Sequence, residues 1–120
     1  MADSKHVLVV EDEKPLAHAL QLKLESQGFT VTITSDGQEG LTALETGAFD
    51  VALVDLMMPV MNGFELLEAI GKKDVKTKII VLSNLSQKED EERVFGLGAT
   101  GFFIKSDTPL SQIIEEVNKL

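Results

Sequence analysis

The chain of 120 residues contains no cysteine and only two histidines. Without cysteine it can form no disulfide and offers no thiolate metal ligand and no thiol nucleophile, which excludes zinc-finger sites and is compatible with a reducing compartment. His6 precedes the first apolar run and His18 falls on a predicted helix, so neither is expected to bind a metal. Any metal site must therefore be built from oxygen ligands.

Basic residues and long apolar runs are also scarce. The chain has 11 Lys and Arg against 20 Asp and Glu, a formal net charge of −9. This balance argues against binding to a nucleic-acid backbone or an anionic membrane, and favours cations or basic surfaces as ligands. No apolar run approaches membrane-spanning length, and the N-terminus has neither a positive lead nor an apolar signal core. We expect a single domain over residues 1–120, located in the cytoplasm.

Short apolar runs recur along the chain between helical patterns. Runs at 7–10, 51–54, 79–82 and 102–104 predict buried strands, and the β-branched alternation at 29–34 predicts an edge strand with Val31 and Ile33 on one face. Strands that alternate with helices through short connections predict an α/β fold, an open parallel sheet covered by helices on both faces. In the flavodoxin-like, doubly wound order 2-1-3-4-5, ligands gather at the carboxyl edge between strands one and three.

Five helical patterns lie between and after these runs, each with its own end signals. The first helix is predicted to begin near Pro15 and to end at Gly28, and the second to begin at Ser35 or Asp36 and to end near Gly47. The third is marked by apolar Phe64, Leu67 and Ile70. The charged fourth helix is predicted to begin at Ser86 or a neighbour and to end at Gly96 or Gly98, and the fifth to be capped by Thr108 with Pro109.

Polar side chains follow four of the five predicted strands. Glu11 and Asp12 follow the first, Asp55 the third, Ser83 the fourth and Lys105 the fifth. Because the ends of parallel strands meet at one edge of a sheet, we expect these groups to converge.

The converging groups predict a cation site. Three carboxylates repel one another unless one is protonated or a cation is held, and Lys105 offsets only one of the three charges. The remaining charge and the oxygen ligands suit Mg²⁺ or Mn²⁺. With a phosphate completing the metal shell, Asp55 becomes the nucleophile, and Lys105 and Ser83 stabilise phosphoryl oxygens. The predicted product is an aspartyl phosphate.

The same residues carry a family resemblance. The Glu11-Asp12 pair, the segment 55–59 with Asn62 and Gly63, and then Ser83, Phe102 and Lys105 resemble the receiver domain of bacterial two-component response regulators over the whole chain.

The resemblance implies that Asp55 accepts a phosphoryl group from a sensor histidine kinase or a small phosphodonor. It implies Mg²⁺ on Asp12, Asp55 and the Met57 carbonyl, with Glu11 acting mostly through water. It further implies a switch rather than an enzyme: Ser83 moves toward the phosphoryl group and Phe102 turns inward. The surface around the last two helices and the fifth strand would then be read by an output domain or protein.

Two departures from the family pattern bear on this interpretation. Ser106 follows Lys105 where the family most often has proline after a cis bond, which leaves the geometry of the 105–106 bond open. Met57 and Leu85, two residues beyond the acceptor and the hydroxyl, are apolar and cannot orient an attacking water. We therefore predict slow loss of the phosphoryl group, with a lifetime longer than seconds.

Other interpretations of these residues remain. A small-molecule phosphatase or phosphotransferase with an Asp nucleophile would want a second acid near Asp55 and a covering insertion, and a degenerate receiver could serve only for docking. Phe102 could simply be core, because only one of Phe102 and Phe103 is expected to face inward, and Met57, Met58 and Met61 could be loop and core filler. The Gly-x-Gly-x-x-Gly pattern at 96–101 follows a helix and precedes a strand, the reverse of a dinucleotide-binding turn.

Overall fold

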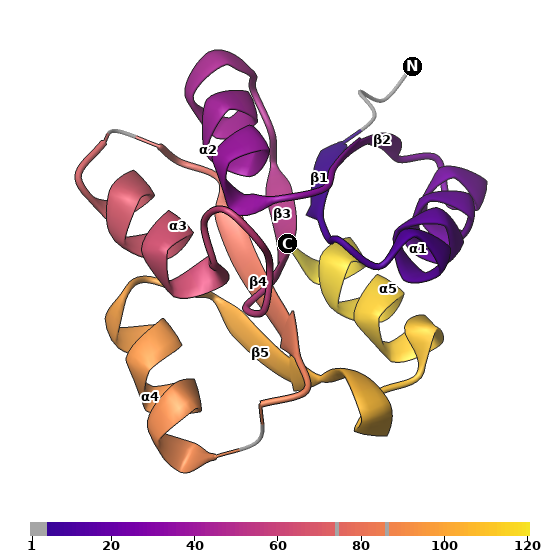
Figure 1. Ribbon diagram of the computed structural model, residues 1–120. Helices are drawn as coiled ribbons and strands as arrows, with labels where there is room; N and C mark the ends of the chain where they lie inside the picture. The colour runs from indigo at the N-terminus through magenta and orange to yellow at the C-terminus, as the bar shows by residue number, and fades with distance from the viewer. Residues whose placement is uncertain (1–4, 74, 86) are drawn as a thin grey trace.

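The computed structural model describes residues 5–73, 75–85 and 87–120, and its centre is a five-stranded sheet (Figure 1). Every strand pair is parallel, and the order is β2-β1-β3-β4-β5. The strands are β1 (His6–Val10), β2 (Thr30–Thr34), β3 (Val51–Asp55), β4 (Lys78–Ser83) and β5 (Gly101–Ile104). The flavodoxin-like order predicted from the sequence is confirmed.

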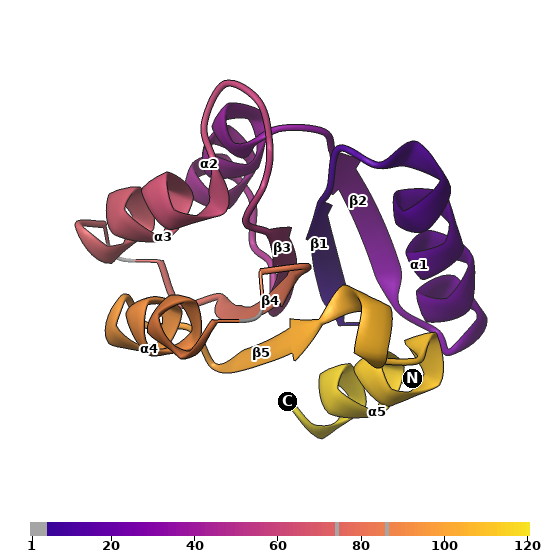
Figure 2. The same ribbon diagram turned by 60° about the horizontal axis from the view of Figure 1, so that its bottom comes forward.

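The helices form two layers, one on each face of the sheet (Figure 2). They are α1 (Lys14–Ser26), α2 (Gly37–Thr46), α3 (Gly63–Gly71), α4 (Lys88–Gly96) and α5 (Leu110–Lys119), with a 3₁₀ turn η1 (Lys105–Asp107) after β5. Helices α1 and α5 cover one face, and α2, α3 and α4 cover the other. None of the helices described reaches the length and apolarity that a bilayer crossing requires.

The strands are apolar on both sides because both sides are covered. Leu8 and Val54 pack toward α2, α3 and α4, whereas Val9 and Leu53 pack toward α1 and α5. The same arrangement corrects the expectation that only one of Phe102 and Phe103 faces inward. Both are partly buried, Phe102 against the layer of α2, α3 and α4, and Phe103 against the layer of α1 and α5. Successive side chains of a strand point to opposite faces, and here each face is a core.

Most helix ends follow the predicted signals. Asp36 caps α2 by accepting a hydrogen bond from the Glu39 backbone at 2.8 Å, and Gly28, with φ of 94°, follows the end of α1. Two predictions are wrong in detail. Thr108 is not the cap of α5, which begins after Pro109 without a side-chain cap, and β2 begins at Thr30 rather than at Phe29. Ser86 lies outside the described residues, and Gln87 occupies the position before α4 without a side-chain capping hydrogen bond.

The edge strand β2 is wetter than the predicted pattern implies. Val31 is partly buried against the α1 and α5 layer, but Ile33 is 37% exposed. An edge strand has a sheet neighbour on one side only, so its outer end is covered less completely.

Candidate functional site

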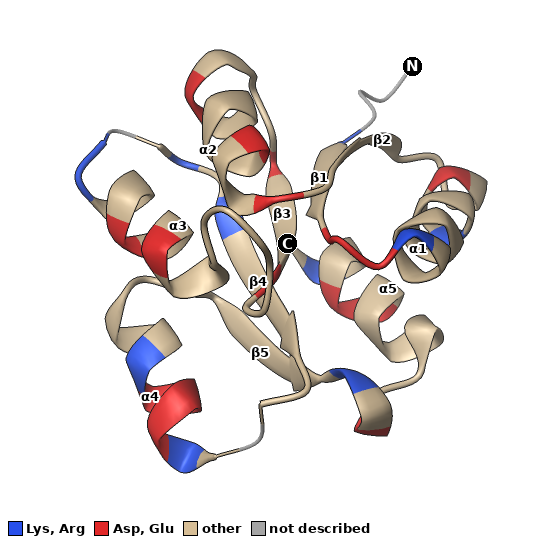
Figure 3. Ribbon diagram, viewed as in Figure 1, with Lys and Arg blue, Asp and Glu red and all other residues tan. Residues whose placement is uncertain are grey.

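The polar groups at the strand ends converge on the carboxyl edge of the sheet, as predicted. Val10, the last residue of β1, lies beside Val54 in the strand register. Glu11, which follows β1, and Asp55, which ends β3, therefore come from the ends of neighbouring strands. Ser83 lies beside Ile104, the residue before Lys105. Figure 3 shows the acidic β1–α1 connection and the basic residue at the start of η1 on this edge.

Lys105 is the centre of the cluster. Its Nζ donates a hydrogen bond to Asp55 Oδ2 at 2.9 Å and lies 2.8 Å from Glu11 Oε1. These three side chains are nearly removed from solvent, with exposures of 10% for Lys105, 4% for Asp55 and 2% for Glu11. Buried charges persist only when paired, so the ammonium holds the two carboxylates together.

Glu13 is a fourth charged group that the sequence prediction missed. Its Oε2 accepts a hydrogen bond from Lys105 Nζ at 2.6 Å, and its side chain is 57% exposed. Its backbone N–H donates to Glu11 Oε2 at 3.0 Å. The run of three acids at 11–13 indicated that Glu13 lies near the cluster. The sequence pattern did not reveal that the side chains of Glu11 and Glu13 contact the same lysine.

The pKa of Glu11 is raised to about 7. Burial is the main cause, because it penalises the charged form, and the Asp55 charge adds to it, while Lys105 and the Glu13 backbone act in the opposite direction. For Lys105, burial lowers the pKa, but the carboxylates of Glu11, Glu13 and Asp55 together raise it above its ordinary value. The lysine is therefore fully charged at neutral pH.

The acids could also hold a cation. Glu11, Asp12 and Asp55 each offer a carboxylate oxygen, and these oxygens lie within 4.8 Å of one another. Asp12 is exposed at the rim while Glu11 and Asp55 are buried. Apart from the ion pair with Lys105 at 2.8 Å, the buried Glu11 Oε1 has no hydrogen-bond partner among the described residues. An oxygen-only donor set in which two of the carboxylates are buried fits a hard divalent ion such as Mg²⁺.

The β3–α3 loop sets the outer wall of the site. Met57 N–H donates to Asp55 Oδ1 at 3.2 Å. Met57 is 59% exposed in the loop, and Met58 and Met61 are partly buried against the core, which agrees with the interpretation of these methionines as loop and core filler. Gly63 is needed where the loop enters α3, because a side-chain carbon there would lie 2.6 Å from the Asp55 carbonyl oxygen.

Ser83 is fully buried at the end of β4. Its Oγ accepts a hydrogen bond from the Leu85 N–H at 3.0 Å, which leaves the hydroxyl hydrogen as a donor. Leu85 itself is partly buried against the α2–α4 layer.

Sequence comparison identifies the family to which this architecture belongs. The family described as "Response regulator receiver domain" matches residues 7–118. The chain belongs to this family. Receiver domains are the signalling domains of two-component response regulators, and response regulators interact with sensor kinases and output domains.

Curated relatives and solved structures agree with this assignment. The chain is 38% identical over 100 residues to the uncharacterized transcriptional regulatory protein YkoG of Bacillus subtilis, covering 83% of this chain and 44% of that protein. It is 36% identical to the cell cycle response regulator CtrA of Brucella ovis over 82% of this chain and 43% of the relative. The chain thus spans less than half the length of the curated relatives it matches.

Two solved receiver structures have the same backbone. The receiver domain of a Francisella response regulator superposes with a TM-score of 0.91 at 31% identity, over 97% of this chain and 95% of that one. The Vibrio cholerae chemotaxis protein CheY4 gives a TM-score of 0.89 at 27% identity, over 98% of both chains.

The receiver domain keeps Lys105 in place despite the missing proline. No described peptide bond is cis, so the bond between Lys105 and Ser106 is trans. Lys105 nevertheless reaches Asp55 from the first residue of η1. The substitution of Ser106 for the usual proline therefore does not remove the lysine from the cluster.

Proposed function

We propose that this receiver domain, formed by residues 1–120, is a switch that accepts a phosphoryl group on Asp55. The donor would be a sensor histidine kinase or a small phosphodonor such as acetyl phosphate. The observation that carries the proposal is the buried Asp55 carboxylate held 2.9 Å from the Lys105 ammonium at the open edge of the sheet.

In the proposed step, a carboxylate oxygen of Asp55 attacks the phosphorus of the donor. An oxygen–phosphorus bond forms, and the bond from phosphorus to the donor nitrogen or oxygen breaks. The donor leaves with that electron pair. Acetate leaves as its carboxylate, and a kinase histidine leaves as an imidazole that takes up one proton from solvent. Lys105 neutralises charge on the phosphoryl oxygens, and the Met57 N–H keeps the Asp55 carboxylate oriented.

Magnesium, or manganese, would be held by Asp12, Asp55 and the Met57 carbonyl, with Glu11 behind them. When bound, the ion supplies charge neutralisation for the carboxylates and the incoming phosphate. The support from this chain is its oxygen-only donor set and the buried Glu11 oxygen that has no partner among the described residues besides the Lys105 ammonium.

The proposed response to phosphorylation starts at Ser83. Its buried hydroxyl would donate to a phosphoryl oxygen, which draws the β4–α4 connection toward Asp55. Phe102 is only partly buried against the α2–α4 layer, so it can turn further inward when that connection moves. The surface around α4, β5 and α5 would then change for a downstream output domain or protein.

The experiment is intact-mass measurement after incubation with acetyl phosphate and Mg²⁺. The wild type should gain one phosphoryl group, and the adduct should be lost in hydroxylamine, which cleaves acyl phosphates. Asp55→Asn should gain none, and chelation of the metal should prevent the gain in the wild type. Asp50→Asn, at the other end of β3, is the matched control and should be phosphorylated normally.

Each alternative gives a different result. A small-molecule phosphatase would release inorganic phosphate with many turnovers and no lasting adduct, and a docking module would give neither adduct nor phosphate. A lasting adduct with slow release would also confirm the predicted effect of the apolar Met57 and Leu85. Failure of the wild type to gain mass would overturn the proposal.

A further inference from the structure

The Lys105 ammonium has as many carboxylate contacts as it has hydrogens. It donates to Glu13 Oε2 at 2.6 Å and to Asp55 Oδ2 at 2.9 Å, and Glu11 Oε1 lies 2.8 Å away. An ammonium carries three N–H donors. A phosphoryl oxygen that needs this lysine must therefore replace one of the three carboxylates.

The three contacts are not equally easy to break. The side chains of Glu11 and Asp55 are 2% and 4% exposed, so a carboxylate that lost the lysine would be left buried and unpaired. The Glu13 side chain is 57% exposed and would simply return to water. Exposed ion pairs contribute little to stability, so the contact between Glu13 and Lys105 is the one that breaks most easily.

Glu13 is nevertheless held in position to compete. Its backbone N–H is fixed by the buried Glu11 carboxylate, and it immediately precedes α1, whose second residue is Pro15. The carboxylate therefore faces Lys105 from a fixed anchor point and not from a long free loop.

We propose that Glu13 is a positioning residue that occupies the third donor of Lys105 in the resting state and must release it for phosphorylation. This inference rests on the proposed function of Asp55. Glu13 then sets how readily the lysine meets the phosphoryl group, and so tunes the rate of activation.

Three substitutions separate the contact from the charge. Glu13→Ala removes both, Glu13→Asp keeps the charge but is too short to keep the contact, and Glu13→Gln removes the charge but keeps an oxygen acceptor. At saturating Mg²⁺, the rate of phosphorylation by acetyl phosphate should rise about threefold to fivefold in Glu13→Ala and Glu13→Asp, the size expected for one exposed ion pair. Glu13→Gln should fall between these variants and the wild type.

A second measurement does not depend on phosphorylation. The ¹⁵N resonance of the Lys105 ammonium in the metal-free protein should shift in Glu13→Ala and Glu13→Asp. Glu25→Ala, at an exposed position of α1, is the matched control and should change neither quantity.

The outcomes distinguish this inference from the function on which it rests. Phosphorylation rates within 1.5-fold of wild type in all three variants would overturn it. A wild-type rate in Glu13→Asp together with equally raised rates in Glu13→Ala and Glu13→Gln would also overturn it, because the charge alone, and not the contact with Lys105, would then be responsible. A wild type that cannot be phosphorylated while the Lys105 resonance still shifts would overturn the proposed function and leave the contact between Glu13 and Lys105 established.

Discussion

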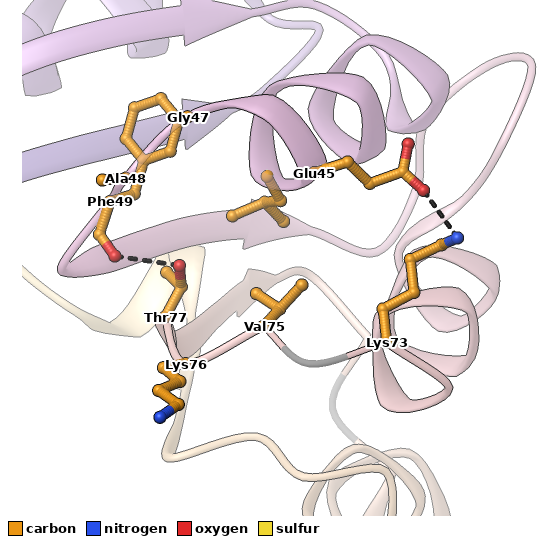
Figure 4. Close-up of a pocket in the computed structure, with 9 residues that line it drawn as sticks. Glu45, Gly47, Ala48, Phe49, Lys73, Val75, Lys76 and Thr77 are labelled. Atoms are coloured by element: carbon orange, nitrogen blue, oxygen red, sulfur yellow. Dashed lines mark hydrogen bonds and ion pairs between the residues drawn. The ribbon is translucent and has the colours of Figure 1, made fainter.

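The two edges of the sheet hold ion pairs of the same length in different surroundings. At the amino edge, a cavity of about 520 Å³ lies between the end of α2 and the α3–β4 connection (Figure 4). Lys73 and Glu45 pair across it at 2.9 Å with side-chain exposures of 47% and 34%. At the carboxyl edge, Lys105 and Asp55 pair at the same distance with exposures of 10% and 4%.

The volume of a cavity therefore does not indicate which edge of the sheet holds buried charge. The amino-edge cavity is spacious, but its charges are solvated, and the Phe49 carbonyl and the Thr77 hydroxyl satisfy each other at 2.9 Å. The carboxyl edge concentrates charge that water does not screen, and buried titratable groups of this kind cluster at functional sites.

Backbone strain follows the same division. Among the described residues, the turns that precede β2 and β5 at the amino edge have positive φ at Gly28 and Gly98, where glycine adopts it freely. At the carboxyl edge the positive φ of 69° falls on Val60, a β-branched residue that is 80% exposed. The edge with buried charge is thus also the edge with a strained loop.

The largest expected effect comes from removing the lysine at each edge. Lys105→Met leaves Glu11 and Asp55 buried without their cation, so the metal-free protein should lose about 3–4 kcal/mol of stability. Lys73→Met removes a solvated pair and should cost less than about 0.5 kcal/mol. Urea unfolding at pH 8 measures both, and equal losses would contradict the comparison.

The second effect is a pH dependence confined to the carboxyl edge. The folded-state pKa of Glu11 is raised to about 7, so its contribution to stability is present below its ordinary pKa and is lost as the pH rises through 7. Glu11→Gln should therefore stabilise the metal-free protein at pH 8 by about 1–3 kcal/mol and have little effect at pH 5.

The control for this pH dependence lies at the amino edge. Glu45→Gln should change stability by less than about 0.5 kcal/mol at either pH, because its partner Lys73 is solvated. Thermal unfolding followed between pH 5 and pH 8 gives both profiles. A Glu11→Gln profile parallel to that of the wild type would be inconsistent with the raised pKa.

The smallest effect concerns strain. Val60→Gly relieves the positive φ of a β-branched residue, partly offset by the greater freedom of glycine in the unfolded chain, and should stabilise the protein by about 0.5–1 kcal/mol. Gly98→Ala, at the amino edge, should destabilise it by a similar amount because its φ is 103°. Destabilisation by Val60→Gly would show that the loop is not strained.

The recurring apolar runs of the sequence were sufficient to predict the sheet and the edge at which its polar groups lie. Apolar runs that end at Glu11, Asp55, Ser83 and Lys105 predicted the strands and the edge where their ends meet, because parallel strands leave no other arrangement. The part it missed depends on reach. Glu13 contacts Lys105 across 92 positions of sequence, and only the folded sheet brings their side chains together.

Local conformation was also beyond the sequence pattern. Val60 has no residue signature for positive φ, and the pairing of both Phe102 and Phe103 with core layers follows from coverage on two faces rather than from the dipeptide itself. Thr108 and Pro109 matched a capping pattern, yet the helix begins without a side-chain cap. Capping signals of this kind locate the start of a helix to within a few residues, but they do not show which hydrogen bonds cap it.

The distance along the chain between Lys105 and its partners has a consequence for newly made protein. The acids of β1 and β3 can approach one another before β5 has docked onto β4, but the ammonium arrives only with that last strand. In a molecule whose β5 has not docked, Glu11 and Asp55 therefore lack their ammonium. The buried charged cluster is complete only when the whole sheet has formed.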